Sequence, residues 1–550
     1  MPFCENCGNK VNETDRFCEN CGHSLSSEVL TDDKITSTFD CDFYFNVFST
    51  PKWKQNWDGV VKQGSCFRYG IILTNTNDCP PSLKEKFYDT LKTYIEFRAS
   101  HNVCYCVLDL ASQNIKHTFS STAVRSIDFV VDILKDVSNI ALPQCLMIVG
   151  DRDAIPSIKW SNPLHIPGDE RGDADQYVDS DLPYVILDTK SPFENYSFKF
   201  KIEVGRIPSV AKTGFPEAQK YFNNTMRCTP SAPIKPIVLT AIEWAQTSQV
   251  SYNINKELFT CPDYSFVPHP NLYLLDNKSD NNLLCFNLHG RPEGCGAMWG
   301  YPDSVDDEWV SGDHNVAYSP KYLPLNANMP YVISTEACYG AKPFIRNTNQ
   351  QSILMTAIQN HCIGYLGSTQ IAYGTADTIL HQLPPYGADV ISGKFSLYVS
   401  QGYTIGSAYF KALTSTIGFN SEDFVTNHDI KTISSFALYG DPTVALANNN
   451  FAHTKSFSTE LETYINVSMS NIRRVVELKI TELSDYITER VDAYIRENFA
   501  WYSDVTPICY KLKDYNGYNV TYSKKDSNLA RILSMYLDAD GNVQKVYTSK

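Results

Sequence analysis

The sequence predicts an α/β protein built on a mostly parallel sheet that is flanked by helices. Short runs that are apolar at nearly every position, such as CFRYGIIL, VCYCVLDL and QCLMIVGD, alternate with helical periodicity at 83–99 and 121–137. Similar runs return in KIEVGRIP, IKPIVLTAI, NLLCFNLHG and YVISTEAC. Strands of this kind are typical of a parallel sheet covered on both faces, in which chemistry lies beyond the carboxyl ends of the strands.

Length and composition exclude several classes of protein. The 550 residues are 43% hydrophobic and 13% aromatic, which excludes a disordered chain. The net charge of −14 gives no chain-wide attraction for nucleic acid or an anionic membrane. The chain has no uncharged apolar stretch of about 18 residues and no secretory signal pattern. We therefore expect a soluble, cytoplasmic protein without a membrane span, whose cysteines in apolar runs are reduced.

The N-terminal segment carries a metal-binding pattern. Cys4, Cys7, Cys18 and Cys21 form two C-x2-C pairs, and the pentapeptide CENCG occurs twice. Four thiolates in two tight turns favour tetrahedral Zn²⁺, and so short a segment has too little core to fold without a metal. Two disulfides or a redox pair are the alternatives, but neither explains the duplication. Residues 1–25 resemble the zinc ribbons found at the N-termini of many bacterial proteins.

The charge of this ribbon favours a structural role or a protein partner over nucleic acid. The ribbon has two basic residues, Lys10 and Arg16, and four acidic residues, Glu5, Glu13, Asp15 and Glu19. A nucleic-acid sensor acting through the ribbon is a further alternative, and salt-dependent binding would reveal it. The polar, aperiodic residues 26–40 predict a linker.

Reactive residues follow two of the predicted strands. NLLCFNL runs into His289-Gly290, and YVISTEA runs into Cys338. A Cys thiolate can attack a carbonyl carbon, a His can protonate the leaving amine, and the unobstructed N–H of Gly290 can bind an oxyanion. The pair therefore predicts a cysteine peptidase. Glu170 or Glu336 could orient His289, or could be structural acids.

Several motifs occur in a characteristic order. They are IVGDRDAIP at 148–156, SDLPY at 180–184, VGRIP at 204–208, His-Gly at 289–290, EAC at 336–338, GYLGST at 364–369 and ALYGDPTVAL at 437–446. Through them, residues 66–446 resemble the gingipain-type cysteine peptidases, part of the caspase-like clan that also includes clostripain, legumain, separase and caspases.

This resemblance implies a caspase-like sheet in two subdomains, an N-terminal one at 41–230 and a catalytic one at 231–446. It also implies an endopeptidase with Cys338 as nucleophile and His289 as its partner. The N–H groups of Gly290 and Cys338 would form the oxyanion hole.

Asp181 is the candidate for selecting the substrate. In arginine-cleaving gingipains an acidic residue of the S-D-x-x-Y segment lies in the substrate pocket, and Asp181 holds that position here. A buried carboxylate would select Arg or Lys before the cleaved bond, although Asp181 could instead cap a turn. Trp299 and Tyr301 could line the same pocket or pack their own loop.

The chain has two further acidic clusters, of which the one after the catalytic His is a rival determinant of specificity. One follows the catalytic His and comprises Asp303, Asp306 and Asp307, and the other is the Asp-rich stretch 169–181. These clusters could bind Ca²⁺, as happens in secreted relatives, but neither has EF-hand spacing. We interpret most of these residues as solvated acidic loops.

The region after residue 446 lies outside the resemblance. Residues 457–498 lack Gly and Pro and predict one long amphipathic helix, whose stripe could bind a protein partner, a second copy or the peptidase. The stripe is spaced by three or four residues and consists of Ile472, Val476, Ile480, Leu483, Ile487, Val491 and Tyr494. Residues 499–550 alternate around N-G and D-G turn signals and predict a small β-rich domain.

Together these patterns predict a cysteine endopeptidase that cleaves after Arg or Lys and is regulated through the zinc ribbon and the C-terminal region. A partner, a metal or cleavage of an internal loop could restrain it. The alternative from another class is a catalytically idle or latent adaptor, which keeps the peptidase fold and binds proteins through the ribbon.

Overall fold

The computed structural model describes most of the chain from residue 39 onward. The described residues are 39–63, 66–118, 126–169, 171–194, 198–228, 234–241, 244–253, 265–267, 281–292, 298–299, 316–320, 329–343, 352–376, 385–419, 425–446, 476–513, 515–526 and 529–549. The predicted zinc ribbon 1–25, most of the linker 26–40 and the first part of the predicted helix 457–498 lie outside them.

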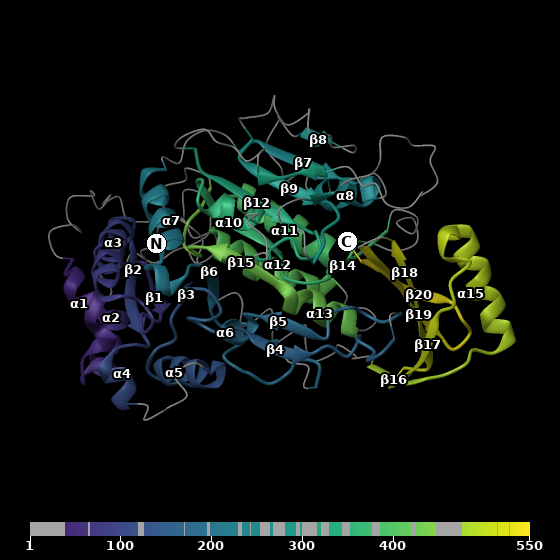
Figure 1. The fold of residues 1–550 in the computed structure, drawn as a ribbon, viewed down its shortest axis with the longest axis horizontal. Coiled ribbons are helices and arrows are strands. Elements are labelled where there is room, and N and C mark those ends of the chain that lie inside the picture. Colours follow the sequence, from purple (N-terminus) through teal and green to yellow (C-terminus); the bar gives the residue numbers. More distant parts are fainter. Residues whose placement is uncertain are drawn as a thin grey trace, which may run out of the picture.

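A ten-stranded, mostly parallel sheet forms the centre of the molecule (Figure 1). The predicted α/β architecture is therefore confirmed at this level. In spatial order the strands are β2 (Val103–Asp109), β1 (Arg68–Thr74), β3 (Cys145–Val149), β6 (Glu203–Ile207), β15 (Phe436–Gly440), β13 (Cys362–Ser368), β12 (Tyr331–Thr335), β9 (Leu283–Asn287), β7 (Pro236–Thr240) and β8 (Ser265–Val267). Within the described residues, β13 and β15 are the antiparallel neighbours of this sheet.

The sheet is buried on both faces, as the apolar runs predict. Side chains of β1 alternate between two cores, with Ile71 and Leu73 in one and Ile72 in the other. The first core is covered by α5 (Ile127–Ile140), α11 (Ala388–Ser400), α12 (Ile405–Phe419) and α13 (Asn427–Ser435). The second is covered by α3 (Pro81–Ser100), α7 (Pro216–Arg227) and α10 (Ile353–Ile358).

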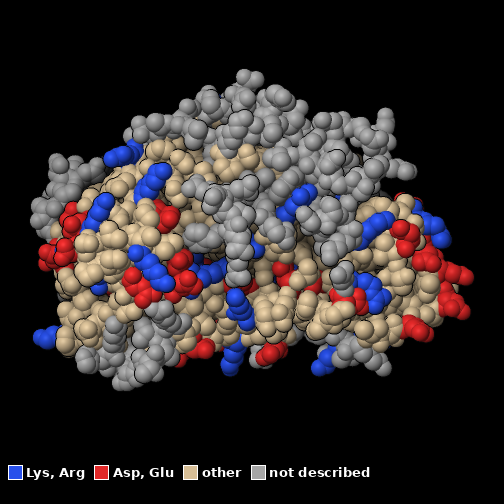
Figure 2. All heavy atoms as spheres, viewed as in Figure 1, with Lys and Arg blue, Asp and Glu red and all other residues tan. Residues whose placement is uncertain are grey.

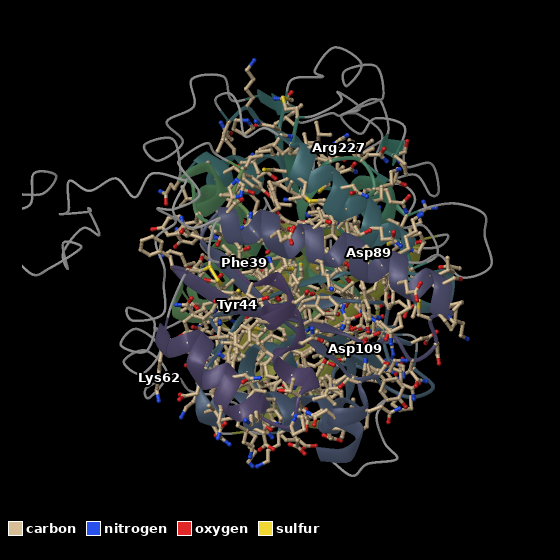
Figure 3. All side chains as sticks on the ribbon, turned by 90° about the vertical axis from the view of Figure 1, so that its left-hand side faces the viewer. Phe39, Tyr44, Lys62, Asp89, Asp109 and Arg227 are labelled. Atoms are coloured by element: carbon tan, nitrogen blue, oxygen red, sulfur yellow. A yellow bond between two sulfur atoms is a disulfide. The ribbon has the colours of Figure 1, made fainter. Side chains whose placement is uncertain are left out.

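The described chain begins with two short helices at one end of the sheet, α1 (Cys41–Asn46) and α2 (Trp53–Gln63). The rings of Phe39 and Tyr44 stack with centroids 4.6 Å apart, and Figure 3 shows them beside each other. Trp57 of α2 is fully buried and donates a hydrogen bond to the Ala141 carbonyl at 2.9 Å. Aromatic packing therefore fixes this end of the fold.

A disulfide joins Cys66, just before β1, to Cys104 in β2. The expectation that cysteines in apolar runs are reduced is therefore wrong for Cys104. Cys106 in the same run is a free, buried thiol, as expected. The Cα atoms of Cys66 and Cys104 lie 5.7 Å apart, which is within the usual range for a disulfide.

The strand β15 joins two groups of parallel strands. It pairs with β6 on one side through Tyr439 and Arg206, and with five residues of β13 on the other. We call β2, β1, β3 and β6 the first half of the sheet, and β13, β12, β9, β7 and β8 the second half. Because β15 comes late in the sequence, the two halves are fixed together only when it is in place.

The residue after β15, Asp441, is a fully buried carboxylate that reinforces this join. It accepts hydrogen bonds from the hydroxyls of Tyr94 and Tyr105, each at 2.6 Å, and from the Thr443 amide at 2.8 Å. The Arg98 Nε lies 3.3 Å from its Oδ2. Burial of a carboxylate is tolerated only with such partners, which here come from α3 and β2 of the first half.

The C-terminal region supplies strands β16 to β20, which we call the C-terminal sheet, and with β14 they form a second, six-stranded sheet in the order β14-β20-β19-β18-β17-β16. Its strands are β14 (Tyr373–Gly374), β16 (Val476–Ile480), β17 (Ile508–Lys513), β18 (Gly517–Asp526), β19 (Leu529–Asp538) and β20 (Val543–Ser549). The predicted N-G and D-G turns lie between β17 and β18 and between β19 and β20. In Figure 1 this sheet lies at the opposite end of the long axis from α1 and α2.

The prediction of one continuous helix over 457–498 is wrong. Residues Val476–Ile480 are strand β16, paired with β17, and the helix α15 spans Asp485–Asn498. The Ser484 side chain accepts a hydrogen bond from the Ile487 amide and so starts the helix there. Ile480 of the predicted stripe is 64% exposed.

The helix α15 is amphipathic, as expected for its part of the stripe. Ile487, Val491 and Ile495 are buried against the C-terminal sheet, and the outer positions are exposed. Figure 2 shows acidic side chains gathered over this end of the molecule. Among the described residues, no helix combines the length and apolarity needed to cross a membrane.

We predict that Asp441→Ala lowers the free energy of unfolding by about 3–5 kcal/mol, because it leaves the buried Arg98 without its carboxylate. Urea denaturation followed by tryptophan fluorescence measures this change. Asp504→Ala is the control, since Asp504 pairs with Lys524 at the surface, and it should leave the transition midpoint unchanged. Equal midpoints for the Asp441 variant and the wild type would contradict the stabilising role of the Asp441 carboxylate.

Candidate functional site

The predicted Cys/His pair lies at the ends of two adjacent strands. β9 and β12 are parallel neighbours, with Phe286 opposite Thr335, and the Glu336 amide donates to the Phe286 carbonyl at 2.8 Å. His289 and Cys338 follow these strands two or three residues later. Their segments therefore meet at one edge of the sheet.

Gly290 is packed directly against the backbone of Cys338. A Cβ atom at residue 290 would lie 1.7 Å from the Cys338 carbonyl oxygen and 3.0 Å from its amide nitrogen. No residue with a side chain fits this contact without moving the chain. The sequence reasoning, which valued Gly290 for an open amide, therefore underestimated how tightly the two segments approach.

Cys338 is buried in this structure. Only 5% of the residue is exposed. Its thiol donates a hydrogen bond to the Ala372 carbonyl at 3.8 Å. Burial raises the pKa of the Cys338 thiol to about 12, so the thiol is protonated at neutral pH. The next residue, Tyr339, has a positive φ of 56°, a conformation that costs energy for a side chain of this size.

His289 packs against an aromatic residue that sequence reasoning missed. The rings of His289 and Trp244 have centroids 4.4 Å apart, and both residues are buried. Trp244 follows β7, the strand next to β9, so a search of every strand end would have found it. Of the two proposed orienting acids, Glu336 is buried and accepts a hydrogen bond from the Tyr252 hydroxyl at 3.0 Å, while Glu170 lies outside the described residues.

Asp181 is held by a cation of the chain itself. Its two carboxylate oxygens accept hydrogen bonds from Nε and Nη2 of Arg206, at 2.6 and 2.7 Å. The same guanidinium donates to the carbonyls of Gly150 and Ile155, each at 3.0 Å. In this structure Arg206 therefore occupies the carboxylate that is predicted to receive a substrate cation.

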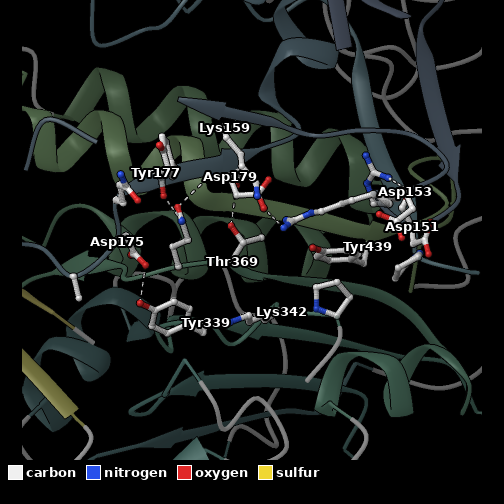
Figure 4. Close-up of a pocket in the computed structure, with 17 residues that line it drawn as sticks. Asp151, Asp153, Lys159, Asp175, Tyr177, Asp179, Tyr339, Lys342, Thr369 and Tyr439 are labelled. Atoms are coloured by element: carbon white, nitrogen blue, oxygen red, sulfur yellow. Dashed lines mark hydrogen bonds and ion pairs between the residues drawn. The ribbon is translucent and has the colours of Figure 1, made fainter. Parts of the chain in front are cut away.

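A cavity of about 470 Å³ opens beside the residue that follows Cys338 (Figure 4). Tyr339 lines it, and its walls carry both signs of charge. The charged lining residues are Asp151, Asp153, Asp175 and Asp179, and Arg152, Lys159, Arg206 and Lys342. Of the other predicted pocket residues, Trp299 lies in the short strand β10 (Met298–Trp299), and Tyr301, Asp303, Asp306 and Asp307 fall outside the described residues.

Part of the Asp-rich stretch is buried rather than solvated, in contrast to our interpretation. Lys431 of α13 is fully buried and pairs with Asp173 and, at 2.8 Å, with Asp175. Asp175 also accepts a hydrogen bond from the Tyr339 hydroxyl at 2.7 Å. This internal ion cluster therefore holds the residue next to Cys338. Neither a hydrophobic periodicity nor a motif around Lys431 in the sequence predicts this buried ion cluster.

Metal ligands are not gathered in the described part of the chain. There, no group of three or more His, Cys, Asp or Glu side chains is arranged to hold an ion. The four predicted zinc ligands, Cys4, Cys7, Cys18 and Cys21, lie outside this part.

Comparison with known proteins finds a similarity in the N-terminal segment. Residues 3–25 match the family model of the zinc-ribbon domain and include all four cysteines of the C-x2-C pairs. No curated protein matches the chain.

We predict that Asp181→Ala lowers the free energy of unfolding by about 3 kcal/mol, because the Arg206 guanidinium is 2% exposed and loses its carboxylate. Adding Arg206→Met should recover part of this loss, since it removes the stranded charge. Denaturant unfolding of the single and double variants measures both effects. An Asp181→Ala protein of unchanged stability that binds basic peptides more weakly would instead restore the substrate-binding role.

Proposed function

We propose that the protein is a cysteine endopeptidase with Cys338 as nucleophile and His289 as its proton-transfer partner. The observation that carries the proposal is the contact between Gly290 and the Cys338 backbone at the ends of β9 and β12. It places the His-Gly segment and the Cys segment at one edge of the sheet. The strained φ of Tyr339 supports the proposal, since backbone strain clusters at functional sites.

In the proposed reaction His289 takes the proton of the Cys338 thiol, the sulfur attacks the peptide carbonyl carbon, and the carbonyl π electrons move to the oxygen. The amides of Gly290 and Cys338 would bind that oxyanion. Collapse breaks the C–N bond, and protonated His289 gives its proton to the leaving amine. Water then hydrolyses the thioester, which releases the carboxylic acid and regenerates the thiol.

The proposal includes a preference for Arg or Lys before the cleaved bond, but it assigns that preference to other carboxylates than Asp181. Asp181 is committed to Arg206, and Asp175 and Asp179 are paired with Lys431 and Arg152. The other carboxylates lining the cavity are Asp151 and Asp153, which we propose meet the substrate cation.

The test is hydrolysis of fluorogenic peptides ending in Arg, Lys, Asn, Asp or Leu under reducing conditions. We expect Cys338→Ala and His289→Ala to lower the rate by at least about 10³-fold, because each removes a reacting group. Cys228→Ala, at the end of α7, is the control and should retain the wild-type rate. Equal hydrolysis by the wild type and Cys338→Ala would contradict the proposal.

A second candidate function is the latent or idle adaptor, which the burial of Cys338 and its raised pKa favour. An adaptor would bind partner proteins through the ribbon and cleave none of the peptides. The same peptide panel therefore separates the two candidates, provided that it is also run on the opened variants described below.

We further propose that Cys4, Cys7, Cys18 and Cys21 bind one Zn²⁺ as four thiolates. The purified full chain should contain one zinc per molecule, released by a thiol reagent and measured with a colorimetric indicator. Cys18→Ser should lower the zinc content to near zero, because a tetrahedral structural site rarely survives loss of a thiolate. Cys228→Ser is the control. Full zinc content in the Cys18 variant would contradict the site.

A further inference from the structure

The C-terminal sheet is buried on both faces. One face packs against α15 in a cluster that includes Leu533 and Met535 of β19. The alternate side chains of the same strand, Ile532 and Tyr536, belong to a different cluster on the opposite face. The sheet is thus a layer between its own helix and the segments that follow β12 and β13.

Cys338 is a member of the cluster on that opposite face. The cluster joins residues from both sides of the contact: Cys338, Tyr339, Ile371, Tyr373 and Tyr386 from the peptidase region, and Leu512, Ile532, Tyr536 and Tyr547 from the C-terminal sheet. Each of these residues is less than 9% exposed. The C-terminal sheet therefore contributes to the apolar surroundings that keep water from the Cys338 thiol.

The backbone segment that lies beside the Cys338 thiol also pairs with a strand of the C-terminal sheet. The Cys338 thiol donates to the carbonyl of Ala372, and β14 begins at the following residue. β14 pairs antiparallel with β20, with Tyr373 opposite Ser549 and Gly374 opposite Thr548. An extended peptide that added to this edge by backbone hydrogen bonds would lie beside the thiol. The chain's own last strand already occupies that edge.

Hydrogen bonds between buried side chains hold the contact in register. The Tyr547 hydroxyl donates to Asp429 at 2.8 Å and accepts from Thr426 at 3.0 Å. The Tyr536 hydroxyl lies 2.9 Å from Nδ1 of His428. Thr426 and Asp429 also form the capping box that starts α13, so the contact is built on a rigid helix start.

We propose that the C-terminal sheet is a built-in inhibitor of the Cys338 site, which it holds closed by covering the thiol and by pairing β20 with the β14 edge where an extended substrate would bind. The inference rests on the proposed peptidase function and names the regulation of that site. Displacement of the sheet exposes the thiol to water, which favours the thiolate, and leaves the β14 edge open to a substrate main chain.

The experiment opens the contact in the full-length protein by two variants. Ile532→Asp places a charge in the buried face, and the pair Tyr536→Phe with Tyr547→Phe removes the two hydroxyls without changing shape. Tyr522→Phe is the matched control, because Tyr522 is buried in the cluster that faces α15. Should Ile532→Asp fail to fold, the isosteric pair decides.

Two measurements are made on each protein. The first is the rate of Cys338 alkylation by iodoacetamide under native conditions, read by peptide mass spectrometry. Cys285 of β9 is the internal reference, since it is fully buried in the core on one face of the large sheet. The second is hydrolysis of the fluorogenic peptide panel.

We expect both opened variants to raise Cys338 alkylation and peptide hydrolysis by about tenfold or more, the size expected from losing one or two net hydrogen bonds. Cys285 and the Tyr522→Phe protein should show no change. Wild-type alkylation and hydrolysis as fast as in the isosteric pair would overturn the inhibitory role and leave the peptidase function standing. Faster alkylation of Cys338 without cleavage of any peptide would overturn the peptidase function and, with it, the inhibition.

Discussion

The buried carboxylate of Asp441 is the interaction on which the arrangement of the large sheet depends. It follows β15, the strand that lies between the two halves, and collects hydroxyl, amide and guanidinium donors from α3, β2 and its own turn. A carboxylate that is fully buried must either find such donors or become protonated, and the tyrosine and arginine donors come from α3 and β2, at the first half. The first half carries Asp181 and Arg206, and the second carries Cys338. Their relative placement therefore depends on a residue with no part in the proposed chemistry.

The second constraint is the close approach of Gly290 to Cys338. Backbones meet this closely only where no Cβ intervenes, so the contact fixes the two strand ends more tightly than side-chain packing could. Cys338 is also buried here, and burial outweighs the nearby Lys431 cation, so it raises the pKa of the thiol and keeps the thiol protonated. Two features of the site thus oppose each other. The contact between the two strand ends suits the proposed acyl transfer, while burial keeps the proposed nucleophile Cys338 protonated.

Sequence reasoning succeeded where a local pattern determines structure. The apolar runs and the residues that follow them predict the strands and the juxtaposition of the His-Gly and Cys segments. The same reasoning failed where tertiary partners decide. The ion pair of Asp181 is set by Arg206, on a strand more than twenty residues away. Val476 and Ile480 fit a helical stripe, yet pairing with β17 makes them a strand, because backbone hydrogen bonding to a neighbour overrides periodicity. The Cys66–Cys104 disulfide likewise depends on the approach of two segments that lie 38 residues apart in the sequence.

The form of the C-terminal contact determines what could control the site. The ladder between β14 and β20 is only two residue pairs long, so backbone pairing alone holds the sheet weakly, and side-chain contacts provide the rest. A tethered strand nevertheless has an effective concentration of the order of millimolar, which a free peptide substrate rarely reaches. Under the proposed inhibition, a rise in substrate concentration is therefore a poor way to activate the site. An activator must instead bind or move the C-terminal sheet, because any ligand that prefers the displaced sheet shifts the equilibrium by its difference in affinity for the two states.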